Sequence, residues 1–73
     1  MAKPTNDLIR IAAAGGGMYV SASKPTDDLI RIAAAASNKG ARIFVTDASR
    51  KPTDDLIRIA ASGNGCVMFD LSS

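Results

Sequence analysis

Apolar and polar residues follow one another along the chain in a pattern that occurs three times. An eleven-residue block at residues 3–13, KPTNDLIRIAA, recurs at 24–34 and 51–61 with a single change, Asn6 to Asp27 and Asp54. On a wheel of about 100° per residue, the apolar positions of the first block cover an arc of about 200°. That arc is wider than the stripe of a surface helix. Each block therefore predicts a helix that is covered beneath and on both flanks, as in stacked repeats.

Local signals mark where the predicted helices begin and end. Proline biases the residue before it away from the helical region, so each Lys-Pro pair favours an extended entry. The next residue is expected to cap the helix, and Asp follows in the first turn, where the helix dipole favours negative charge. These expected caps are Thr5, Thr26 and Thr53. Gly15 and Gly63 stand where the first and third helices are expected to stop.

A short strand-like run follows each helix. The runs are MYVS at 18–21, IFVT at 43–46 and MFDL at 68–71, aligned from the glycine that precedes each. β-branched and aromatic residues favour strands, and strands joined through helices run parallel. The sequence therefore predicts an α/β fold: a three-repeat, solenoid-like unit with a three-stranded parallel sheet and three short helices on one face. It predicts one domain at 1–73, with repeats at 3–23, 24–50 and 51–73.

The DDLIRIA helix and the strand that follows it resemble short bacterial proteins built from α/β repeats with a GxVxF-type strand. The resemblance covers nearly the whole chain. It implies a repeat architecture and no activity, so no functional residue is carried over from it.

Alternation along the strands divides their side chains into two rows. One row is expected to contain every aromatic residue of the chain, namely Tyr19, Phe44 and Phe69. The opposite face is expected to carry Met18, Ile43 and Met68, accompanied by Val20, Val45 and Asp70. Which row lies beneath the helices stays open. Three aromatic side chains carry roughly 450–750 Å² together, against about 300–600 Å² for the largest apolar patch of a typical monomer.

Either arrangement exposes apolar surface, so the first six of those residues form a candidate interface: Tyr19, Phe44, Phe69, Met18, Ile43 and Met68. The composition also favours association, because 13 of the 34 hydrophobic residues are alanine and few large side chains remain to form a core. Small scaffolds of this kind usually add disulfides, metals or self-association. The sequence predicts a homo-oligomer, by base rate a dimer, which associates through the open sheet face or the flanks of the terminal repeats.

Absent residue types exclude several kinds of chemistry. The chain has no His and one cysteine, Cys66, so a Ser-His-Asp or Cys-His mechanism, an ordinary zinc site and an intrachain disulfide cannot form within it. Asp47 and Asp70 are expected on different turns, with no shared cleft for acid–base work. We therefore expect a non-enzymatic protein without cofactor or metal. Cys66 is expected to be buried as a small hydrophobic residue. A single thiol favours a reducing, cytoplasmic compartment. No apolar run reaches the roughly 20 residues that a membrane helix needs.

An alternative function uses polar side chains at the carboxyl ends of the strands, where ligands usually bind in open parallel sheets. Hydroxyls, cations and helix N-termini could hold an anion there; the candidate rim is Ser23, Lys24, Thr26, Ser49, Arg50, Lys51 and Thr53. The aromatic row could stack the bases of a single-stranded nucleic acid. A net charge of +2 and seven Asp disfavour such a partner. The first hypothesis is thus a module for self-association that binds protein where it has a partner. The alternative is a small single-stranded nucleic-acid or anion binder.

Overall fold

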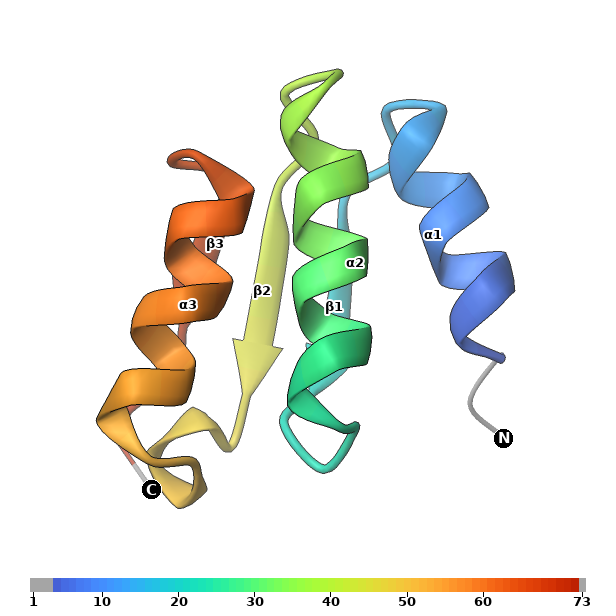
Figure 1. Cartoon of the computed structure of the whole chain (residues 1–73). Coiled ribbons are helices and arrows are strands. Elements are labelled where there is room, and N and C mark those ends of the chain that lie inside the picture. The colour runs from blue at the N-terminus through green and yellow to red at the C-terminus, as the bar shows by residue number, and fades with distance from the viewer. Residues whose placement is uncertain (1–3, 73) are drawn as a thin grey trace.

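The computed structural model describes residues 4–72 as alternating helices and strands (Figure 1). The helices are α1 (Thr5–Ala13), α2 (Thr26–Ser37) and α3 (Thr53–Gly63), and the strands are β1 (Met18–Ser21), β2 (Ile43–Thr46) and β3 (Val67–Phe69). A short 3-10 helix, η1 (Ala48–Arg50), lies between β2 and α3. The strands form one parallel sheet in the order β1-β2-β3. All three helices cover the same face of it. The predicted α/β class and parallel sheet are confirmed. Residues 1–3 and 73 lie outside the described residues, so the predicted start of the first repeat at residue 3 does as well.

Each α-helix begins directly after a proline. The residues in the N-cap position are Pro4, Pro25 and Pro52, all in the same extended conformation. The Pro4 carbonyl accepts hydrogen bonds from the amides of Asp7 and Leu8 at 3.0 and 3.2 Å, and the other two prolines do the same. The prediction of threonine caps was therefore wrong. Each threonine is the first helical residue, and proline suits the position before it because a missing N–H costs nothing there.

The predicted helix stops are only partly right. Gly15 follows α1 with φ +99°, a left-handed conformation that favours glycine. Gly63, in contrast, is the last residue of α3, and Asn64 makes the left-handed turn with φ 50°. Gly63 is buried, and a Cβ atom there would collide with the side chain of Val67. Its role is to let the end of α3 approach β3.

The sheet register corrects the expected rows. β1 and β2 have the predicted bounds, with Tyr19 beside Phe44. β3 lies one residue earlier than predicted, so Phe44 pairs with Met68, and Phe69 pairs with Val45. A slip of one residue moves every side chain to the opposite face. The predicted register would have put the carboxylate of Asp70 beneath the helices, whereas the observed one puts apolar side chains there.

The core lies between the helices and the inner face of the sheet. The inner rows are Met18–Ile43–Val67 and Val20–Val45–Phe69. Twelve hydrophobic residues are buried among the described residues, and six of these are alanine. The question of which row faces the helices is thereby answered: Met18 and Ile43 pack inward, while Tyr19 and Phe44 face away. Within residues 4–72, no helix has the length and hydrophobicity that crossing a membrane requires.

Candidate interaction surfaces

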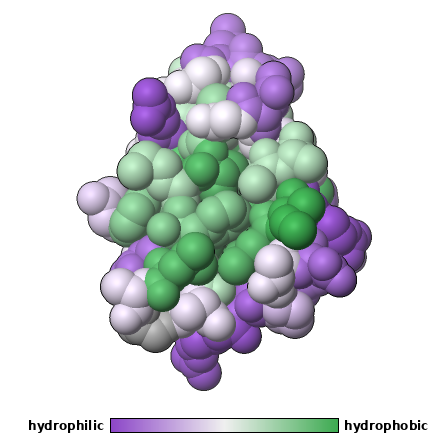
Figure 2. All heavy atoms as spheres, turned by 90° about the vertical axis from the view of Figure 1, so that its left-hand side faces the viewer, coloured by the Kyte–Doolittle hydropathy of each residue, from purple (hydrophilic) through white to green (hydrophobic). Residues whose placement is uncertain are grey.

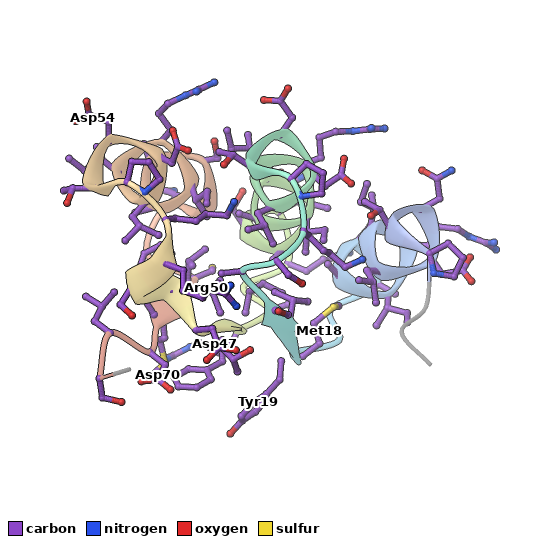
Figure 3. All side chains as sticks on the ribbon, turned by 90° about the horizontal axis from the view of Figure 1, so that it is seen from below. Met18, Tyr19, Asp47, Arg50, Asp54 and Asp70 are labelled. Carbon is purple, nitrogen blue, oxygen red and sulfur yellow. The ribbon has the colours of Figure 1, made fainter. Side chains whose placement is uncertain are left out.

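The outer face of the sheet carries a short apolar row of Tyr19, Phe44 and Met68. Tyr19 is 78% exposed and Met68 49% exposed. The rings of Tyr19 and Phe44 pack at a centroid distance of 4.9 Å with a tilt of 54°. Figure 3 shows Tyr19 projecting from the side of the sheet opposite the helices. We call these three residues the outer row; Arg42 lines the same hollow.

The candidate interface predicted from the sequence divides between the two faces. Tyr19, Phe44 and Met68 come together on the outer face, whereas Met18, Ile43 and Phe69 lie on the inner face. Phe69 was misplaced because the third strand was aligned from its preceding glycine. The signal that could have corrected the alignment is Asp70, which a core-facing position would have left buried without a partner.

A second apolar surface lies along the outer side of α3 and β3. Ile57 is 59% exposed and Leu71 58% exposed. They line one hollow together with Leu56, Ala60 and Phe69. Figure 2 looks at this side of the molecule and shows a continuous hydrophobic area with hydrophilic residues around it. We call these five residues the tail flank. Ile57 and Leu71 were not among the predicted site residues.

The opposite side of the molecule has a smaller apolar feature on α1. Asp7, Arg10, Ile11 and Ala14 line a hollow there, and we call them the head flank. Ile11 is 39% exposed. The head flank thus combines one exposed isoleucine with one acidic and one basic side chain.

A hydrogen bond of the same kind joins each pair of neighbouring helices. The Thr5 hydroxyl donates to Asp28 at 3.0 Å, and the Thr26 hydroxyl donates to Asp55 at 3.0 Å. In both cases the threonine that was expected to cap its own helix reaches the first turn of the following helix. These bonds set the lateral position of the helices relative to one another.

The candidate anion rim is only partly assembled. Ser49, Lys51 and Thr53 line the hollow of the tail flank. Thr26 is already bound to the carboxylate of Asp55, and Ser23 shares a hydrogen bond of 2.9 Å with the hydroxyl of Ser21. Because carboxylates already stand beside the helix starts, an anion gains little there.

The two carboxylates outside the helices follow β2 and β3 (Figure 3). Asp70 accepts hydrogen bonds from the Ser72 hydroxyl at 2.6 Å and from the Ser72 amide at 3.1 Å. The hydroxyl first, and the amide second, hold the pKa of Asp70 below its ordinary value. A lowered pKa keeps the group ionised, the opposite of what a general acid needs. Asp47 takes a left-handed conformation, φ 58°, at the start of η1.

Cys66 precedes β3 and is half-buried rather than buried as predicted. Its carbonyl accepts a hydrogen bond from the Ile43 amide at 2.9 Å, so its backbone continues the sheet. Across residues 4–72, no three Cys or Asp side chains are grouped as metal ligands would be.

Comparisons with protein-family models, curated proteins and solved structures gave no significant match to this chain.

Proposed function

We propose that this chain is a non-enzymatic repeat module of the solenoid type whose function is self-association. Each repeat contributes one helix and one strand, and α2 packs between α1 and α3. The strands follow one another in chain order across the sheet. A stack built in this way buries the apolar sides of its middle repeat and leaves those of its outer repeats open.

The observation that carries the proposal is the amount of large apolar surface left outside a small core. Within residues 4–72, five large hydrophobic side chains are exposed, namely Ile11, Tyr19, Ile57, Met68 and Leu71. The buried core among residues 4–72 is made of small and medium-sized side chains; its largest fully buried members are Ile32, Ile43, Ile59 and Val45. Covering apolar surface gains about 25 cal/mol per Å². Association of copies therefore adds the burial that each chain by itself lacks.

The mass of the protein in solution tests this proposal. Light scattering across a hundredfold range of concentration is expected to show a mass above that of one chain, rising with concentration. Sulfate is expected to strengthen the association, because it favours burial of apolar surface. A mass of one chain at the highest concentration would overturn the proposal.

The outer row supports a second candidate, binding of single-stranded nucleic acid. Tyr19 and Phe44 are adjacent on an open sheet face, with exposed Arg42 beside them. Base stacking on such rings contributes about 1–3 kcal/mol per base. Binding of a labelled single-stranded oligonucleotide should then weaken with salt and with Tyr19→Ala. A titration without binding at low salt would remove this candidate.

A further inference from the structure

Each end of the helix layer exposes a position that is covered in the other two helices. Ile11, Ile32 and Ile59 occupy the same position of the repeated block. Ile32 is fully buried and Ile59 is 1% exposed, whereas Ile11 is 39% exposed. α2 and α3 each have a preceding helix beside them, and no described helix precedes α1. The exposure of Ile11 follows from its missing neighbour.

The same comparison on the other flank identifies Ile57. Ile9 and Ile30 hold the equivalent position on α1 and α2, and both are half-buried against the core. Ile57 is 59% exposed, because no described helix follows α3. The head flank therefore exposes the side chains of a helix that face the preceding helix. The tail flank exposes the side chains that face the following helix.

The polar contact between helices is incomplete at the same two places. Thr5 and Thr26 each donate to the aspartate of the next helix, Asp28 and Asp55. The next hydroxyl in this series is that of Thr53, which is exposed and has no hydrogen-bond partner among the described residues. The carboxylate equivalent to Asp28 and Asp55 is that of Asp7, likewise without a hydrogen bond to a described residue. A donor remains at the tail and an acceptor at the head.

Among the described residues, the sheet has an unpaired edge on the same two sides of the molecule, at β1 and at β3. β2 is paired on both sides, and the outer edges of β1 and β3 have no strand partner within residues 4–72. Continuing the observed register would place Met18 of another copy beside Val67, and Val20 beside Phe69. Both inner rows would then continue with apolar side chains. Unpaired edges of this kind readily add a further strand.

We propose that a second copy of this chain docks head to tail, with its α1 and β1 against α3 and β3 of the first. This inference rests on the proposed self-association and specifies its interface. The occupant is a second copy because the two flanks match the two sides of a junction that the chain already forms twice, between α1 and α2 and between α2 and α3. Across the new junction Thr53 donates to Asp7, and Ile11 packs beside Ile57.

Charge agrees with this orientation. Within the chain, Arg58 of α3 lies 3.9 Å from Asp27 of α2. The equivalent pair across the proposed junction is Arg10 of the incoming copy with Asp54 of the first. Both members of the internal pair are largely exposed, so such a contact adds little energy.

A head-to-tail contact joins two different surfaces, so it does not close after two copies. Each added copy exposes a new tail or head, and growth gives an open chain or a ring. A dimer formed through the outer row, in contrast, would use the same surface twice and stop at two copies.

Two lysine variants and their mixture test the proposal. Ile11→Lys blocks the head and Ile57→Lys blocks the tail, because a buried lysine without a partner is costly. Each variant alone should need at least about tenfold more protein to associate than the wild type, a change that corresponds to roughly 1.4 kcal/mol. An equimolar mixture should form dimers and no larger species, since the first variant keeps a tail and the second keeps a head. Ala34→Lys, at an exposed position of α2, is the matched control and should associate as the wild type does.

The outcomes separate this inference from the proposed function. Association of both variants like the wild type, with Tyr19→Lys reduced to single chains, would overturn the head-to-tail contact and leave self-association standing. A wild type that remains a single chain would overturn both. Folded variants that stay single chains when mixed would also overturn the head-to-tail contact. Far-UV circular dichroism checks folding; if a lysine variant unfolds, Ile11→Ser and Ile57→Ser replace the pair, with the same mixed dimer expected.

Discussion

The hydroxyl groups of Thr5 and Thr26 link neighbouring helices through the carboxylates of Asp28 and Asp55. Each bond is part-buried and joins residues more than 20 positions apart in sequence, 23 and 29. A threonine followed by acidic residues has the same local pattern whether its hydroxyl caps its own helix or reaches another one. The sequence therefore predicted the helix start and could not predict the partner of the hydroxyl.

We expect Thr26→Val to lower the free energy of unfolding by about 1–2 kcal/mol, because it removes a hydrogen bond to a charged group. Thr53→Val is the matched control. Its hydroxyl is exposed and has no hydrogen-bond partner within residues 4–72, so the change should stay within about 0.5 kcal/mol. Urea unfolding at low protein concentration measures both. Equal losses in the two variants would show that the bond between the helices is not what Thr26 contributes.

Gly63 provides a second test at the residue scale. We expect Gly63→Ala to destabilise the protein by about 1–3 kcal/mol, because the new methyl group collides with Val67 in a packed region. The double variant with Val67→Ala removes the obstructing side chain and should recover part of that loss. A stabilised single variant, the usual effect of replacing glycine within a helix, would mean that α3 and β3 are not in close contact there.

At the scale of the elements, β3 decides which side chains each face displays. The bounds of β1 and β2 could be predicted because each is a compact run of β-branched and aromatic residues. The third run is compatible with two registers, one starting at Val67 and one at Met68. They differ in which face of the sheet carries Phe69. Local propensity does not distinguish the two registers. The cost of placing the Asp70 carboxylate beneath the helices does, and so does the packing of Val67 and Phe69 against the core, which depends on distant segments.

The register predicts different costs for two aromatic substitutions. Phe69→Ala should reduce the free energy of unfolding by about 2–3 kcal/mol, somewhat less than for a fully buried phenylalanine. Tyr19→Ala should change it by less than about 0.5 kcal/mol, because the ring is mostly exposed. Thermal or urea unfolding at low concentration, where copies do not associate, measures the difference. A larger loss of unfolding free energy for Tyr19→Ala than for Phe69→Ala would mean that Tyr19, and not Phe69, faces the helices.

At the scale of the whole molecule, three nearly identical blocks produce three different environments. The isoleucines at positions 11, 32 and 59 share their sequence context, and their exposure depends on which helix stands beside them. The sequence predicted that the flanks of the outer repeats would be open. It did not predict that Ile11 is exposed at one end and Ile57 at the other. That assignment requires the direction in which successive helices are laid across the sheet.

The central claim is that the open flanks of one copy are covered by the flanks of others. Amide hydrogen exchange, followed by NMR on the wild type at low and high concentration, tests it most directly. The account predicts slower exchange along the outer edges of β1 and β3 at high concentration, because each edge then pairs with the other. The amides of β2, already paired on both sides, should change little. Edge amides that exchange at the same rate at both concentrations, in samples whose mass shows association, would contradict the account.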